Sequence, residues 1–137
     1  MPTITRRAVL ALLLLLALPV GAQGPFLNRR TLTISSGQSL SSSVDIKDLP
    51  IVAIQMPAAW TAANLTFQGS SDGTNFFDVY NLEGDEFRVV ASTSRYIVLS
   101  PFEFQWARYI KVRSGTTGTP VTQGADRTLT IITRRVL

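Results

Sequence analysis

The feature that most constrains this fold is a period-two alternation of apolar and polar residues, repeated in short runs from Arg30 onward. In the run 30–35, Leu32 and Ile34 share one face while polar residues occupy the other. This is the pattern of a strand with one buried face, and it recurs between turns rich in Gly, Ser and Pro. The 3.6-residue period of an amphipathic helix is absent from this region. We therefore predict an all-β antiparallel sandwich, jelly-roll-like, of eight to nine strands.

The predicted strands follow one another at close spacing. They span residues 30–35, 44–46, 51–56, 64–69, 76–80, 87–90, 95–99, 108–113 and 127–133. The run 51–56 is apolar on both faces, which indicates a central strand that is covered on both sides. The first and last strands are expected to pair near Leu32 and Ile131, which would bring the two ends of the domain together.

Residues 1–22 have the three-part layout of a secretory signal peptide. Arg6 and Arg7 precede the apolar run 8–20, and Ala22 stands at a position that a signal peptidase reads. From residue 8 to residue 22 the stretch is shorter than the roughly 20 residues that a membrane span needs. We expect a cleaved signal peptide, or else a retained N-terminal hydrophobic segment that forms a helix. The paired arginines also resemble a twin-arginine signal, but ordinary export fits the surrounding residues better.

Cleavage after Ala22 would leave 115 residues, enough for one domain with its own core. We divide the chain into the segment 1–22, a linker over 23–29 and a sandwich domain over 30–137. The first segment predicts a secreted or periplasmic protein. Because the chain has no cysteine, it has no disulfide and cannot be a lipoprotein, so packing alone must hold the domain.

The missing residue types exclude much of the common catalytic chemistry. The chain has no histidine, so a Ser-His-Asp triad and a Cys-His pair cannot form. Its net charge is +4; without Arg6 and Arg7, 11 basic and 9 acidic side chains remain, a net charge of +2. A charge this small does not argue for nucleic acid. We expect a protein that is not an enzyme, has no catalytic residues, needs no cofactor and binds no nucleic acid.

Carboxylates are the remaining candidates for catalysis or metal binding. Most of them occur in turns, where acids form the turn or are solvated, so we assign no catalytic pair. The turn after the predicted strand 64–69 holds Asp72 and Asn75, with Asp78 beyond it, and their oxygens could hold calcium. The more ordinary interpretation is a hairpin turn with Gly73 in the left-handed conformation.

Aromatic side chains are candidates for ligand binding. Trp60 and Trp106 lie in predicted loops next to prolines, and with Tyr80, Tyr96 or Tyr109 they could stack on the apolar faces of sugar rings. Alternatively, the two tryptophans close the open ends of the sandwich, because large aromatic side chains are usually largely buried.

One predicted strand also carries a basic face. Tyr109, Lys111 and Arg113 alternate along the strand 108–113 and therefore share a face. This face could bind a phosphate or an acidic partner. A solvated outer face that discourages edge-to-edge pairing explains the same pattern.

Two stretches resemble discoidin-type domains, the F5/8C or galactose-binding-like family. Residues 65–76 read LTFQGSSDGTNF, and residues 107–113 read ARYIKVR. The resemblance covers about half of the mature chain and implies a jelly-roll sandwich with ligand loops at one end. The cysteine pair of that family is missing here, and its ligand-binding loops have no counterpart.

A longer resemblance points to phages. Residues 52–67 read VAIQMPAAWTAANLTF, residues 110–116 read IKVRSGT, and residues 120–123 read PVTQ. These are similar to small uncharacterised β-sandwich proteins encoded in the structural gene clusters of tailed phages and prophages. The resemblance implies a virion protein, a capsid decoration or adhesion module, which contacts other virion proteins or copies of itself, for example as a trimer. An export-type leader is unusual for such a protein.

The alternative hypothesis is a secreted bacterial carbohydrate-binding module that attaches to a cell-surface glycan through Trp60, Trp106 or a neighbouring tyrosine. The two hypotheses differ in location, since the first places the protein in the virion and the second outside the cell or in the periplasm. A small hydrolase, the third hypothesis, is nearly excluded by the missing histidine and cysteine.

Overall fold

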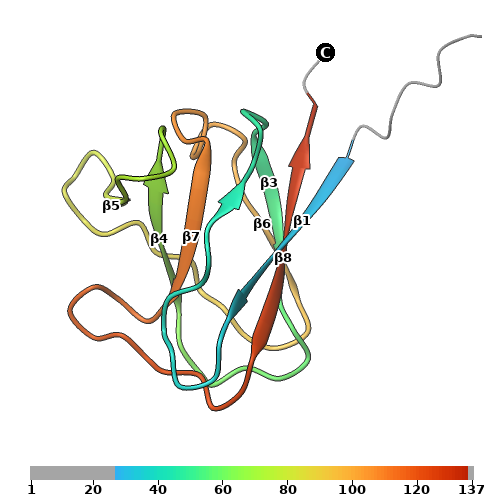
Figure 1. The fold of residues 1–137 in the computed structure, drawn as a ribbon, viewed down its shortest axis with the longest axis vertical. Helices are drawn as coiled ribbons and strands as arrows, with labels where there is room; N and C mark the ends of the chain where they lie inside the picture. Colours follow the sequence, from blue (N-terminus) through green and yellow to red (C-terminus); the bar gives the residue numbers. More distant parts are fainter. Residues whose placement is uncertain (1–26, 136–137) are drawn as a thin grey trace, which may run out of the picture.

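A computed structural model describes residues 27–135, which form two four-stranded antiparallel sheets packed face to face (Figure 1). Sheet A has the strand order β1-β8-β3-β6, and sheet B has the order β2-β7-β4-β5. The strands are β1 (Leu27–Ile34), β2 (Val44–Asp45), β3 (Ile51–Gln55), β4 (Leu65–Ser70), β5 (Phe77–Asp78), β6 (Tyr96–Val98), β7 (Tyr109–Ser114) and β8 (Arg127–Arg134). The predicted all-β sandwich and its strand number are confirmed.

The first and last strands pair as predicted. β1 and β8 are in register along their full length, with Leu32 opposite Leu129. β1 begins at Leu27, before the predicted domain start at Arg30, because β8 continues to Arg134 and gives Leu27 a partner. The predicted N-terminal helix lies outside the described residues, and within them no helix is long and apolar enough to cross a membrane.

The core lies between the two sheets and contains a cluster of three phenylalanines. The ring of Phe67, on β4, lies 5.0 Å from the ring of Phe104 and 5.7 Å from that of Phe87, measured between centroids. Phe67 and Phe104 are almost completely buried. Inward-facing aliphatic residues of both sheets, among them Leu32 of sheet A and Ile110 of sheet B, pack around this cluster. The edge-to-face geometry adds to the free energy gained by burying these rings.

The segment 87–90 corrects one prediction, since it is not a strand. Its pairing is limited to a single bridge in which Val89 and Leu65 exchange backbone hydrogen bonds of 2.9 Å. Phe87 packs inward against Phe67 and Phe104, so the segment serves the core rather than extending sheet B. The apolar pattern correctly indicated burial, but it could not distinguish a ladder from one bridge.

The run 51–56 corrects a second prediction. β3 is central in sheet A, between β8 and β6, as expected. However, only Ile51 and Ile54 of this strand are buried; Val52, Ala53 and Gln55 are half-buried. The inner face of the strand meets the core, whereas the described chain leaves its outer face open to solvent. Apolar residues on both faces therefore indicate a covered strand only where a second layer exists on each side.

The predicted hairpin at residues 64–80 is confirmed, although its second strand is short. Gly69 pairs with Phe77 and Gln68 with Asp78. Gly73, in the connecting turn, has φ of +77°, the left-handed conformation expected for glycine at this position.

Candidate functional site

Four of the aromatic candidates, Trp60, Trp106, Tyr80 and Tyr109, lie in separate regions. The loop with Trp60 follows β3, and the loop with Trp106 follows β6. Because β3 and β6 are adjacent and antiparallel, these loops lie at opposite ends of the sandwich (Figure 1). Tyr80 follows β5, and Tyr109 lies on the outer face of sheet B. The structure therefore brings no pair of these four rings together as one platform.

The two tryptophans differ in their surroundings. Trp60 packs against the core, and its Nε1–H donates a hydrogen bond of 3.0 Å to the carbonyl oxygen of Ala63. Trp106 is 53% exposed, and its indole lies directly over Gly69, where a Cβ would come within 2.7 Å of Cζ3. Its Nε1–H donates to the carbonyl oxygen of Glu103. Trp60 has the packing of an end-closing residue, while half of the Trp106 surface is open to a ligand.

The turn with the proposed calcium ligands is closed by its own hydrogen bonds. The Asp72 carboxylate accepts bonds of 2.8 Å from the backbone N–H groups of Thr74 and Asn75 and from the Asn75 side chain. These bonds, that from the Asn75 backbone foremost, hold the pKa of Asp72 well below its usual value. Asp78 lies on β5 and accepts hydrogen bonds from Gln68 and Arg113 instead. Within residues 27–135, acidic side chains do not gather in groups of three or more that could hold a metal ion.

The basic strand face packs against the hairpin. The ring of Tyr109 lies over Gly73, where a Cβ would be 3.1 Å from it. Lys111 Nζ lies 4.1 Å from the centroid of the Phe76 ring, within the range of a cation–π interaction. Both side chains remain half-buried rather than fully solvated.

Arg113, in contrast, lies beneath the surface, its side chain only 9% exposed. Its guanidinium donates hydrogen bonds to Asp78 at 2.7 Å, to Glu86 at 3.2 Å and to the Thr117 hydroxyl at 2.7 Å. Glu86 also accepts a hydrogen bond of 3.0 Å from the Thr117 backbone N–H. Arg113 thus joins β7, β5, the segment after β5 and the loop after β7, and its donors are used within the chain.

The charge state of Asp78 follows from this network. Burial alone would raise the pKa of Asp78, but hydrogen bonds from Arg113 and Gln68 outweigh burial and lower the pKa below its usual value. The carboxylate therefore stays ionised and paired with Arg113.

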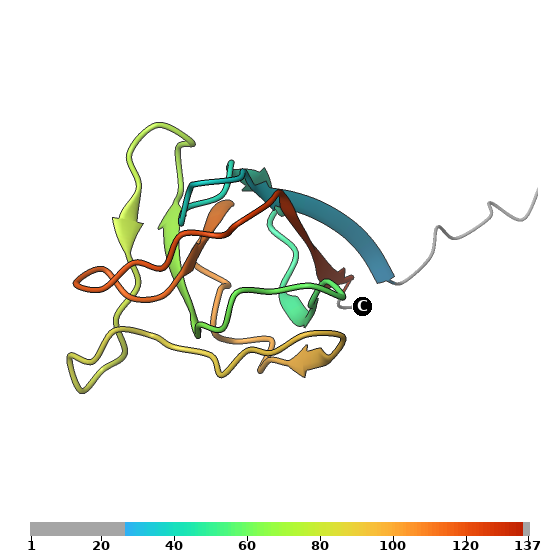
Figure 2. The same ribbon diagram turned by 90° about the horizontal axis from the view of Figure 1, so that it is seen from below.

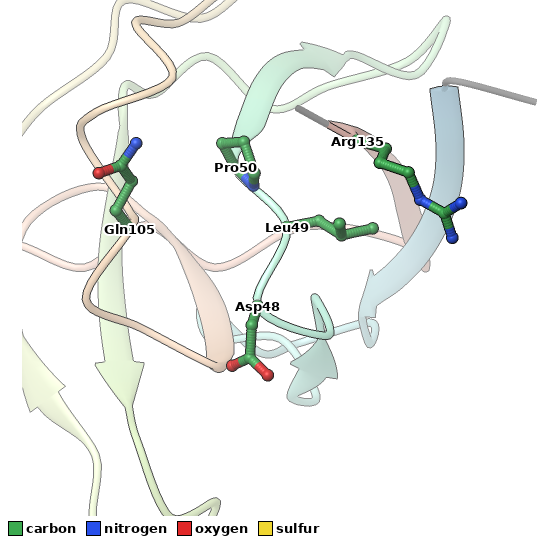
Figure 3. A pocket seen from close by; sticks show the side chains of 5 residues that line it. All are labelled: Asp48, Leu49, Pro50, Gln105 and Arg135. Atoms are coloured by element: carbon green, nitrogen blue, oxygen red, sulfur yellow. The ribbon is translucent and has the colours of Figure 1, made fainter. Parts of the chain in front are cut away.

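The hollow shown in Figure 3 has a volume of about 380 Å³ and lies where the chain enters β3. Asp48, Leu49 and Pro50 line it on one side, with Gln105 and Arg135 from other segments. The polar groups of Asp48, Gln105 and Arg135 point in different directions (Figure 3). A ligand site needs polar groups that converge, and this hollow lacks them.

The sequence analysis missed a second surface, an apolar groove on the outer face of sheet A. Its volume is about 430 Å³, and it is lined by Leu27, Arg29, Val52, Ala53, Tyr96 and Ile132. The sequence signal was the run 51–56, which keeps the apolar Val52 and Ala53 at outward positions.

No protein-family model and no curated protein sequence matches the chain. Among solved structures, the fold is similar to the crystal structure of the SPBc2 prophage-derived protein YomS, with a TM-score of 0.51. The chain resembles a prophage protein. The likeness to YomS covers 81% of this chain and 96% of that chain, at 10% sequence identity. The resemblance to prophage proteins inferred from the sequence is therefore confirmed at the level of the fold.

Proposed function

We propose that this chain is a non-enzymatic structural module of a phage virion, acting in capsid decoration or adhesion. The observation that carries the proposal is the likeness to YomS, which is described as prophage-derived and of which the match covers 96%, against 81% of this chain. The pairing of β1 with β8, β2 with β7, β3 with β6 and β4 with β5 supports the jelly-roll form of the sandwich.

The exposed apolar surfaces fit a protein that functions by binding other proteins. Large apolar side chains stand free on several segments, including Leu82, Phe77 and Phe102. Exposed apolar groups that gather into patches mark interaction sites. The expected partners are other virion proteins or further copies of the chain.

The proposal is tested by measuring whether the chain is a component of purified phage particles. Phage particles produced by the bacterium that carries this gene should be purified on a density gradient, and peptides from residues 27–135 quantified by mass spectrometry. A virion protein is recovered at a fixed ratio to the major capsid protein through further purification. Peptides that are absent, or whose ratio falls with each step, refute the proposal.

The N-terminal peptide of the same sample addresses location. An intact Met1 in particles supports a virion component that retains its leader. A chain that begins at Gln23 and occurs in the culture medium or periplasm, but not in particles, supports the secreted alternative.

Trp106 favours the second candidate function, a carbohydrate-binding module. Its half-exposed indole is held over Gly69, which is the kind of fixed apolar plane on which a sugar ring stacks. Replacing Trp106 by Ala should abolish retention on immobilised bacterial glycans. Unchanged retention excludes Trp106 as the platform.

A further inference from the structure

Charge is divided unevenly between the two sheets. The strands of sheet A contain no Asp or Glu, but they contain four arginines: Arg29, Arg30, Arg127 and Arg134. Six of the nine carboxylates instead lie between residues 72 and 103, around β5 and the segment that follows it. Arg29 and Arg134, opposite Ile132 and Leu27, lie on the outer face of sheet A and make this side basic, whereas Arg30 and Arg127 are opposite the buried Ile131 and Ile34 and face inward. The side around the carboxylate-rich segment 72–103 is here called the acidic side.

The basic side includes the apolar groove of sheet A. Ala53 and Ile132 are opposite each other in register and form its floor, and Leu27, at the start of β1, is 52% exposed at its rim. Val98, the register partner of Ala53 on β6, is 82% exposed beside the groove. These exposed apolar groups extend the groove into a continuous patch. On β3, Val52 and Ala53 are apolar although they face outward, as in a strand that is covered on this face.

Polar groups cross the patch in a fixed arrangement. Arg29 donates a hydrogen bond of 2.7 Å to Gln55 Oε1, and the Tyr96 hydroxyl donates to the same oxygen at 3.3 Å. An adjoining hollow is lined by Gln55, Tyr96 and Arg95 among others. Neither hollow is lined by a carboxylate. An incoming group should therefore be apolar, with negative charge beside it.

The acidic side presents a group of this kind. Residues 80–86, here called the acidic tip, form a narrow turn in which Leu82 is fully exposed. Glu83 and Asp85 follow Leu82 in the sequence, and both are exposed. A hollow of about 450 Å³ beside the tip is lined by three carboxylates, Asp85, Glu86 and Glu103, and by one cation, Arg88, so its net charge is negative.

The acidic tip is held in shape before any partner arrives. The Asn81 N–H donates a hydrogen bond of 2.8 Å to the carbonyl oxygen of Asp85, and the Asp85 N–H donates one of 2.8 Å to Asn81 Oδ1. At its base, Glu86 is bound to Arg113. A loop that is already ordered loses little conformational entropy on binding, so its contacts contribute more fully to affinity.

We propose that the acidic tip of one copy docks in the sheet A groove of the next copy. Leu82 enters the apolar groove, and Glu83 and Asp85 face Arg29 and Arg134 on the outer face of sheet A. The tip and sheet A lie on opposite sides of the molecule (Figures 1 and 2), so one chain cannot satisfy its own groove. The contact is head-to-tail, and it generates a closed ring or an open filament according to the rotation between copies.

A second copy explains both surfaces at once. A free anionic ligand would account for the arginines but would leave the apolar floor of the groove and the exposed Leu82 without partners. This contact does not depend on the proposed function, because copies of a secreted protein would associate through the same two surfaces.

The first experiment measures self-association of the chain expressed from the full-length gene, in the processed or unprocessed form that the cell produces. Sedimentation velocity over a concentration series should show reversible assembly. Leu82→Ser should weaken assembly by about tenfold or more, since the burial of one leucine accounts for at least that factor. Val90→Ser, at a side chain 70% exposed outside both surfaces, is the matched control and should have no effect.

The second experiment tests the head-to-tail geometry. Ala53→Glu fills the groove and places a negative charge there, and should prevent assembly; Arg29→Glu provides a second groove variant at an exposed position. Mixing Leu82→Ser with Ala53→Glu leaves one intact tip and one intact groove in each pair. The mixture should therefore form heterodimers and nothing larger, although each variant alone is monomeric.

Thermal unfolding of each variant confirms that it is folded. A monomer at every concentration overturns the proposal, as does an oligomer that Leu82→Ser does not weaken. Failure of the mixture to form heterodimers refutes the head-to-tail contact. Heparin serves as a polyanionic probe. If the chain is a monomer that binds heparin, and Arg29→Glu abolishes this binding, then the groove binds an anionic polymer and not a second copy. Because all arms use purified protein, they are independent of whether the chain is found in virions.

Discussion

Replacing Arg113 by Met tests whether a buried cation holds the acidic side of the sandwich together. The substitution keeps an apolar stem of similar length and removes the guanidinium. Arg113 makes two ion pairs, with Asp78 at 2.7 Å and Glu86 at 3.2 Å, and is itself 9% exposed. The carboxylates are 21% and 15% exposed, so both would lose their cation in a poorly solvated place.

The magnitude follows from that burial. Breaking a buried pair by removing one partner costs about 3–5 kcal/mol, and the residual exposure of the carboxylates places Arg113→Met near 3 kcal/mol. For a domain of this size, that corresponds to a fall in Tm of roughly 12 °C. Arg108→Met is the matched control. Its side chain is 44% exposed, with pairs to Asp45 at 3.4 Å and Asp48 at 3.5 Å, so its replacement should lower stability far less than Arg113→Met does.

The pH dependence of the stability difference between the wild type and Arg113→Met tests whether this difference comes from the Asp78–Arg113 ion pair. The pKa of Asp78 is lower in the folded state than its ordinary value of 3.8, so the unfolded state binds more protons at acid pH. The stability that Asp78 gains from Arg113 is complete above that ordinary value and is lost as pH falls through the lowered folded value. Thermal unfolding followed by circular dichroism should therefore show a large wild-type advantage at pH 7 and a smaller one at pH 3 and below. Equal effects of Arg113→Met and Arg108→Met, or a difference independent of pH, would refute this reasoning.

Two further predictions concern glycines. Gly69→Ala should push the indole of Trp106 outward, lower stability by about 1–2 kcal/mol and shift tryptophan emission to longer wavelength, because the added Cβ would overlap the ring; an unshifted spectrum would contradict the close contact. Gly115→Ala should cost about 3 kcal/mol or more in the free energy of chemical unfolding, since Gly115 has φ of +88° and the new Cβ would meet the carbonyl oxygen of Thr119. Gly37→Ala, with φ of +76° and open space around it, isolates the backbone strain and should cost only about 1 kcal/mol; equal losses at both sites would show that the contact is unimportant.

The parts of the fold that depend on local pattern were predictable. Alternation over residues 30–35 and 127–133 identified the edge and neighbouring strands, and their similar apolar faces suggested the pairing near Leu32. The Asp-Gly turn identified the β4–β5 hairpin because few residues other than glycine adopt the left-handed conformation of Gly73. These features depend on residues close in sequence or on a period of two.

The role of Arg113 depends on distant segments and could not be predicted in this way. Alternation correctly placed Arg113 on the same face as Lys111, but alternation carries no information about what covers that face. Asp78 and Glu86 reach Arg113 because β5 pairs with β4 and the chain then turns back over sheet B. The sequence interpretation of a basic surface therefore did not anticipate that Arg113 is enclosed by acids, nor that Arg29 and Arg134 lie on the outer face of sheet A.

The described chain begins at the rim of the sheet A groove. Leu27, the first described residue, lines the groove, so any residues that precede it begin at the groove rim. Cleavage after Ala22 would leave only residues 23–26 ahead of Leu27, whereas retention would leave the apolar run 8–20 as well. In general, a segment joined covalently near a binding groove competes with other occupants at a high effective concentration. The processing of the N-terminus therefore bears on how copies of the chain associate as well as on where the chain acts.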